Sequence, residues 1–227
     1  MATPDTMDAA DLAAVLNNGL GGCFYQLRDR ALRALGESTD GGHVMLLTGC
    51  HAGAGVTTVA VNFARAACQS DNGKVLIVDA CGVNGAIHQP FGIPPGPGLA
   101  DHVSGRCDLA EAIQSSRWKQ LDVLPAGSVA MEPSEMIRVS WLDQFLGACR
   151  RRYALTIIDA APVMESNTTA LLAAAAEGTI LVIRAERERW EVAQRAVGLM
   201  RDAGARVIGA VLNRRKHHIP RFLYDWV

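Results

Sequence analysis

The sequence predicts an α/β fold: a doubly wound, mostly parallel sheet with helices on both faces. Short apolar runs rich in β-branched residues alternate along the chain with longer helix-like stretches, which is the pattern of repeated βαβ units. Most of the apolar runs are continuous rather than alternating, as expected for parallel strands covered on both faces. Hydrophobic residues make up 49% of the 227 residues, enough to cover such a sheet with a sizeable core.

The expected elements alternate along the chain. Strands are expected over residues 44–48, 75–78, 121–124, 155–158, 179–183 and 207–212. Helices are expected around and between them, over residues 24–35, 57–68, 109–115, 133–151, 168–176 and 190–203. The segment 93–98, rich in proline and glycine, is expected to be a rigid loop. Ligands of such sheets bind at the carboxyl ends of the strands, so the residues just after each strand are the first candidates for a site.

Charge and cysteine content argue against several classes of protein. The chain carries 22 basic and 23 acidic residues, and this balance argues against attachment to nucleic acid or to a membrane surface by bulk charge. The six cysteines form no CxxC pair, so we expect reduced cytoplasmic thiols rather than a disulfide framework. The amino-terminal residues lack the pattern of a signal peptide. Because no run reaches the roughly 18 uninterrupted apolar residues of a spanning helix, no direct membrane span is expected.

The most informative segment is TGCHAGAGVTT, residues 48–58, which follows an expected strand and precedes an expected helix. A phosphate-binding loop has this context. Gly53 and Gly55 allow close approach of the backbone, so that successive N–H groups point at phosphate oxygens, and the helix adds the positive end of its dipole. Thr57 holds the position of the hydroxyl that ligates Mg²⁺ in such loops, with Thr58 beside it. Taken alone, the segment also fits a glycine-rich turn without a ligand.

The lysine of a phosphate-binding loop is missing, because Val56 stands where the pattern GK[ST] places it. That lysine contacts the β- and γ-phosphates, and a charge-assisted hydrogen bond contributes roughly 1.5–3 kcal/mol. Nucleotide binding is therefore expected to weaken by about one to two orders of magnitude. Phosphoryl transfer is expected to suffer more, because the contact matters most in the transition state.

Two aspartates end expected strands. Asp79 closes the run VLIVD and Asp159 closes LTIID, which places both at the carboxyl edge of the sheet. Together with Thr57 they could hold Mg²⁺ directly or through water. The alternative role of a single aspartate is a helix N-cap or a loop hydrogen bond. Two aspartates at equivalent strand ends beside a glycine-rich loop favour a site.

Five segments, in order, resemble the cytoplasmic domain of the bacterial tyrosine kinases (BY-kinases) of polysaccharide export, relatives of the MinD/ParA-type P-loop ATPases. They are VLIVDACGVNGAIHQPFG (75–92), GLADHVSGRCDLAEAIQ (98–114), LDVLPAGSVAMEPSEMI (121–137), YALTIIDAAPVMESNTTALLAAAAEGTILVIR (153–184) and GAVLN (209–213). The resemblance implies a P-loop NTPase-like domain over residues 22–213. An amino-terminal extension (1–21) would precede this domain, and a basic and aromatic tail (214–227) would follow it.

The resemblance also implies roles for individual residues, with ATP and Mg²⁺ as cofactors that are held weakly. The implied nucleotide-binding residues are Gly53, Ala54, Gly55, Val56, Thr57, Thr58 and Asn213, the last near the adenine. Asp79 and Asp159 are the implied catalytic residues. The implied metal ligands are Thr57, Asp79 and Asp159.

The sequence departs from the family pattern at residues that serve three functions: catalysis, ring assembly and phosphorylation of the tail. At the catalytic site, Val56 replaces the lysine and Cys81 replaces the second acid of the family's DxD segment. In the helix used for ring assembly, Gly22 and Tyr25 replace a glutamate and an arginine. In the tail, where the family carries several phosphorylated tyrosines, this chain has Tyr224 alone. These losses predict a pseudokinase, a regulatory module in exopolysaccharide or capsule biosynthesis or export with weak or no ATP turnover.

Partners and alternatives follow from the same resemblance. The implied partner is the cytoplasmic part of a membrane polysaccharide co-polymerase or an active BY-kinase homologue, and no nucleic acid. The chain would be a cytoplasmic monomer or dimer that reaches the inner membrane through this partner. One alternative is an active Mg²⁺-dependent ATPase or protein tyrosine autokinase of polysaccharide export, with His51 or Arg184 as a substitute cation. Another is a MinD/ParA-like positioning ATPase, although His51 occupies the place of the signature lysine of such proteins.

Overall fold

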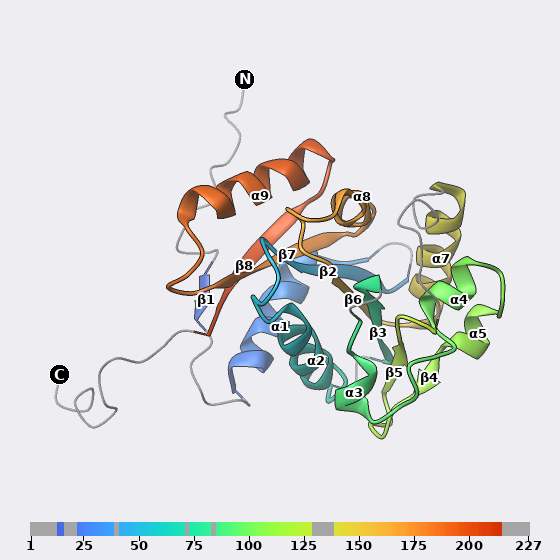
Figure 1. Ribbon diagram of the computed structural model, residues 1–227. Helices are drawn as coiled ribbons and strands as arrows, with labels where there is room; N and C mark the ends of the chain where they lie inside the picture. The colour runs from blue at the N-terminus through green and yellow to red at the C-terminus, as the bar shows by residue number, and fades with distance from the viewer. Residues whose placement is uncertain are drawn as a thin grey trace.

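An eight-stranded sheet forms the centre of the computed structural model, which describes residues 13–15, 22–38, 41–70, 73–82, 85–128 and 139–214 (Figure 1). The strand order is β1-β8-β7-β2-β6-β3-β5-β4. The strands are β1 (Ala13–Val15), β2 (His43–Gly49), β3 (Val75–Ala80), β4 (Gln114–Ser115), β5 (Leu121–Leu124), β6 (Leu155–Ala160), β7 (Gly178–Arg184) and β8 (Val207–Asn213). β4 pairs antiparallel with β5, and the other pairs are parallel.

Helices cover both faces of this sheet (Figure 1). They are α1 (Gly22–Leu35), α2 (Val56–Ala67), α3 (His88–Phe91), α4 (Leu99–Val103), α5 (Leu109–Ala112), α7 (Val139–Arg152), α8 (Asn167–Ala175) and α9 (Trp190–Asp202). One hydrophobic core lies under α1, α2 and α3, and a second lies under α4, α5, α7, α8 and α9. Along β2, Val44 and Leu46 enter the second core, while Met45 and Leu47 enter the first. Because both faces are covered, the central strands are continuous apolar runs.

The predicted fold class is confirmed, and all six predicted strands form. The prediction of a helix over residues 109–115 is wrong at its end. The helix α5 stops at Ala112, and Gln114–Ser115 form β4 instead. The hydroxyl of Ser116 donates to the main-chain oxygen of Leu121 at 2.6 Å. This bond closes the turn that brings β4 back alongside β5, so the local helical pattern gives way to strand pairing.

Several short elements were not predicted. β1 belongs to the segment that we expected to precede the domain, and it pairs with β8 and forms an edge of the sheet. α3 and α4 are single-turn helices within segments whose patterns indicated no element. The predicted helix over residues 133–151 corresponds to α7, and residues 129–138 lie outside the described part of the chain, as do Tyr224 and the rest of the tail after residue 214. No helix among the described residues has the length and apolar character needed to cross a membrane.

The topology brings the predicted site to one edge of the sheet. Asp79 and Asp159 are direct partners in the register of β3 and β6. β2 lies between β6 and β7, and the glycine-rich loop begins at its carboxyl end. The loop and both aspartates therefore lie at the carboxyl ends of adjacent strands, where ligands bind in sheets of this kind.

Candidate nucleotide and metal site

The loop between β2 and α2 has a backbone that requires glycine at two positions. Gly53 and Gly55 have φ values of 83° and 86°, in the left-handed region that glycine adopts without strain. A Cβ atom on Gly55 would lie 2.4 Å from Nδ2 of Asn213. The same Nδ2 donates to the main-chain oxygen of Ala54 at 2.8 Å. The carboxyl end of β8 is thus tied to the loop, and Asn213 lies at this candidate site.

The helix α2 starts at Val56, directly after this loop. It has neither a side-chain cap nor an acidic residue in its first turn, so its first N–H groups are available to an anion. Val56 is partly buried and packs against the hydrophobic core under α2. Its Cγ2 atom lies 3.1 Å from the point where a Cβ of Gly49 would stand. An aliphatic side chain therefore fills the base of the loop. The next residue, Thr57, is partly buried, whereas Thr58 is exposed.

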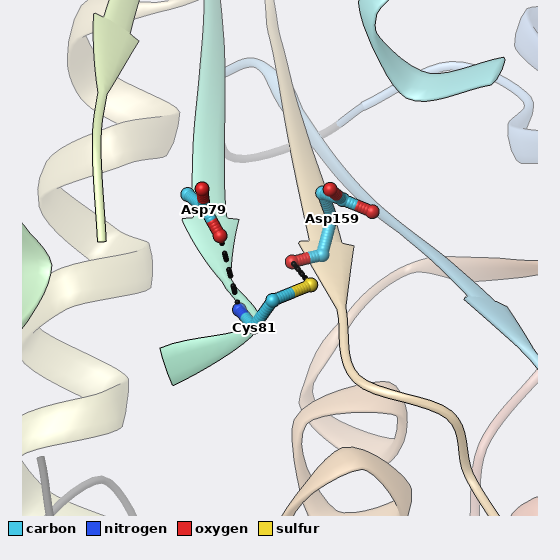
Figure 2. Close-up of side chains that lie close together, drawn as sticks. All are labelled: Asp79, Cys81 and Asp159. Carbon is cyan, nitrogen blue, oxygen red and sulfur yellow. Dashed lines mark hydrogen bonds between the residues drawn. The ribbon is translucent and has the colours of Figure 1, made fainter. Parts of the chain in front are cut away.

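Asp79 and Asp159 lie side by side at the ends of β3 and β6 (Figure 2). They are 1% and 0% exposed. The Asp79 carboxylate accepts hydrogen bonds from the N–H groups of Cys81 at 3.1 Å and Ile87 at 3.0 Å. Among the described residues, neither carboxylate oxygen of Asp159 has a hydrogen-bond partner. A buried ionised carboxylate without a partner is costly, so Asp159 is the group in this site that a cation would stabilise most.

The pKa values of both carboxyls reflect this burial. Burial raises the pKa of Asp159 to about 7. The Thr57 hydroxyl acts to lower this pKa, although it makes no ordinary hydrogen bond to the carboxylate, and the charge of Asp79 acts to raise it. Burial also raises the pKa of Asp79, against the opposing effect of the Ile87 and Cys81 N–H groups. A bound divalent cation would favour the ionised forms of both and so reverse these shifts.

The donor set fits Mg²⁺ and phosphate except at one position. Two carboxylates and the Thr57 hydroxyl supply the hard oxygen ligands that Mg²⁺ takes. The uncapped start of α2 and the two glycines suit phosphate oxygens. The exception is Val56, whose side chain offers a nucleotide neither charge nor hydrogen bond. The structure thus brings the predicted residues together and leaves the charge of the missing lysine unreplaced at its own position.

The two predicted substitute cations differ in their surroundings. Nδ1 of His51 pairs with Glu188 Oε1 at 3.2 Å, so any positive charge on the ring is compensated. Nη1 of Arg184 lies 3.7 Å from the point where a Cβ of Gly53 would stand. Arg184, at the end of β7, therefore lies against the glycine-rich loop, as does Arg214, whose Nε lies 3.6 Å from the point where a Cβ of Gly55 would stand.

Two acids at the loop were not predicted from the sequence motifs. The N–H of Ala52 donates to the Glu165 carboxylate at 3.0 Å, and Glu188 holds His51. Both acids follow a strand by a few residues, Glu165 after β6 and Glu188 after β7. A search for acidic residues shortly after strand ends would have found both. The sequence could not have shown that they hold the loop in place rather than bind a ligand.

Sequence relatives of the chain are tyrosine-protein kinases. It is 28% identical over 173 residues to the tyrosine-protein kinase YwqD of Bacillus subtilis (strain 168), a match that covers 76% of this chain and 72% of YwqD. It is also 28% identical over 171 residues to the tyrosine-protein kinase etk of Escherichia coli (strain K12). That match covers 75% of this chain but 23% of etk, so the chain spans about a quarter of that relative. No protein-family model matches the chain.

Solved structures define the class of protein. The cell division ATPase MinD of Pyrococcus furiosus superposes with a TM-score of 0.62 at 21% identity, over 81% of this chain and 78% of MinD, which shows that the two chains share a P-loop NTPase-like fold. The kinase domain of Escherichia coli tyrosine kinase ETK superposes with a TM-score of 0.79 at 25% identity, over 87% of this chain and 78% of that domain. The chain is a homologue of the bacterial tyrosine-protein kinases, which confirms the resemblance found in the sequence.

Proposed function

We propose that the chain is a degenerate BY-kinase-like regulatory module of exopolysaccharide or capsule biosynthesis or export, which binds Mg-ATP weakly and turns over little or none of it. The observation that carries this proposal is the contrast between the acids that the site retains and the lysine that it lacks. Asp79 and Asp159 keep a buried metal-ligand arrangement, while Val56 packs an aliphatic group where the phosphates would meet a lysine. Kinship with the tyrosine-protein kinases supports the class of system.

In this proposal, binding and transfer depend on different residues. The start of α2 and the backbone around Gly53 and Gly55 would orient the phosphates, and Thr57, Asp79 and Asp159 would hold Mg²⁺, which supplies charge stabilisation when bound. None of these groups replaces a cation that follows the charge of the transferred phosphoryl group. Ground-state binding can therefore persist while the reaction slows.

The proposed partner is the cytoplasmic part of a membrane polysaccharide co-polymerase or an active kinase homologue, which would bring this cytoplasmic chain to the inner membrane. We further propose a monomer or dimer, because α1 uses its polar groups within the chain. Tyr25 donates a hydrogen bond to Gln69. Arg28 donates to the main-chain oxygen of Ala66 at 3.2 Å. Both bonds fasten α1 to the region of α2, so these groups are already engaged.

Calorimetric titration with ATP, with and without Mg²⁺, tests the proposal. We expect weak binding that requires Mg²⁺, together with little autophosphorylation and slow ATP hydrolysis. Submicromolar Mg²⁺-dependent binding coupled to rapid turnover would refute the regulatory assignment. A complete lack of binding would refute the nucleotide site and leave the partner-binding role as a separate question.

A second candidate, an active Mg²⁺-dependent ATPase or tyrosine autokinase, is favoured by the position of Arg184 beside Gly53. If its guanidinium contacts the phosphates, Arg184→Ala should lower the affinity for Mg-ATP by about tenfold or more, because a charged hydrogen bond is lost. Calorimetry measures this effect. The matched control is Arg187→Ala, which removes an exposed arginine three residues along the chain. Equal affinities for the Arg184 variant and the unchanged chain would rule out compensation by this residue.

A further inference from the structure

Cys81 lies next to the two buried aspartates of the site, just past the end of β3 (Figure 2). Its Sγ atom and one carboxylate oxygen each from Asp79 and Asp159 all lie within 4.8 Å of one another. Cys81 is partly exposed as a residue, and burial together with the charges of Asp159 and Asp79 raises the pKa of its thiol. Asp159, which is 0% exposed, has no hydrogen-bond partner for either oxygen among the described residues. The cluster thus combines a sulfur ligand with a buried carboxylate that lacks a counter-charge.

We propose that Asp79, Cys81 and Asp159 form a mixed sulfur and oxygen metal site that binds thiophilic divalent cations such as Zn²⁺ more tightly than Mg²⁺. Cys81 is the residue that determines this specificity. The proposal deepens the metal-binding part of the proposed function, on which it rests. It requires neither ATP nor turnover.

The chemistry of the ligands carries the preference. Mg²⁺ takes oxygen ligands in octahedral geometry and keeps several waters. Zn²⁺ accepts sulfur, nitrogen and oxygen together and is usually four-coordinate. Three protein ligands at one point leave a fourth position for water or a phosphate oxygen. An oxygen-only set would suit Mg²⁺, and replacing one oxygen by sulfur moves the site toward the softer ions.

Hydrogen bonds from the surrounding backbone position the metal ligands and still leave them able to bind a cation. The Cys81 N–H donates to Asp79, which fixes the cysteine beside that carboxylate, and the Ile87 N–H fixes the other Asp79 oxygen. Each carboxylate oxygen keeps a second lone pair for a cation. Cys81 Sγ makes a weak bond, 3.6 Å long, to the main-chain oxygen of Asp159. When sulfur binds the metal, the thiol proton passes to water and only this weak bond is lost.

Titration of the nucleotide-free chain with Cd²⁺ tests the site, because a Cd²⁺–thiolate bond has an ultraviolet charge-transfer band. Calorimetry with Zn²⁺ and Mg²⁺ gives the affinities. We expect Zn²⁺ to bind more tightly than Mg²⁺, and Cys81→Ser to remove the band of one thiolate and to weaken Zn²⁺ binding by about tenfold or more. The matched control, Cys107→Ser, removes another partly exposed thiol. It should keep both the thiolate band and the Zn²⁺ affinity.

A second variant guards against misfolding. Cys81→Asp restores an oxygen ligand and should favour Mg²⁺ over Zn²⁺ while losing the thiolate band. An unchanged band or unchanged Zn²⁺ affinity in Cys81→Ser would overturn the proposal, as would tighter binding of Mg²⁺ than Zn²⁺ by the unchanged chain. Because these titrations contain no nucleotide, their failure is distinct from a failure of ATP binding. A chain that binds Zn²⁺ through Cys81 but no ATP would support this inference and refute the nucleotide site.

Discussion

Replacement of Val56 by lysine should raise the affinity of the chain for Mg-ATP by about one to two orders of magnitude, the range that a charge-assisted hydrogen bond supplies. The side chain starts at the first residue of α2, where an ammonium group would reach phosphates held by the loop. The gain should be larger in turnover than in binding, because the transition state carries more charge on the transferred oxygens. Calorimetry measures the first effect, and an ATPase or autophosphorylation assay measures the second.

Val56→Met is the matched control for this experiment. It also removes the β-branch that packs near Gly49 and lengthens the side chain, but it adds no charge. We expect no gain in affinity from methionine. If lysine also brings no gain, the loop has been remodelled away from a phosphate site, and the retained aspartates serve another ligand. If lysine restores binding but not turnover, the remaining defect lies elsewhere, with Cys81 in place of an acid as the first candidate.

The central pair of aspartates in this site was predictable, because it depends on which strands end at the carboxyl edge of the sheet. The continuous apolar runs before Asp79 and Asp159 indicate parallel strands, and the carboxyl ends of parallel strands meet. The structure places the two aspartates as direct register partners. The glycines were predictable for a local reason, since Gly53 and Gly55 adopt a left-handed conformation. Asn213 came from the family resemblance, and the tie between its amide and the loop confirms only that it lies there.

Other features depend on contacts that no local pattern encodes. β1 and β4 have three and two residues, too few for a periodic signal, and they form because a neighbouring strand offers an edge. The lack of a partner for Asp159 is a property of its buried surroundings. The sequence shows Cys81 two residues after Asp79 but not that its sulfur approaches Asp159 on another strand. Departures from a motif are visible in sequence, whereas their chemical consequence requires the geometry.

The metal-free chain should lose stability as the pH rises, and Asp159→Asn should remove most of this loss. The pKa of Asp159 is about 7 in the folded chain, against an ordinary value of 3.8. The folded state therefore binds the proton more tightly than the unfolded state does. Stability from this group is fully present below about pH 4, falls as the pH rises to about 7 and is constant above. The whole shift corresponds to at most about 4 kcal/mol, and urea unfolding at pH 5 and pH 8 measures the part of this loss that falls between those two pH values.

The comparison with Asp159→Asn isolates this carboxyl, because Asp79 has a raised pKa as well and contributes to the same trend. The amide keeps the shape of the side chain without a charge, so the variant should be more stable than the unchanged chain at pH 8, and by a smaller margin at pH 5. Asp143→Asn, on the exposed surface of α7, should leave the pH dependence as it is. Added Mg²⁺ or Zn²⁺ should stabilise the unchanged chain at pH 8 but not Asp159→Asn, because ligand binding to the folded state adds stability. A variant that unfolds more easily at pH 8 would show that the Asp159 charge has a structural partner and is not held for a cation.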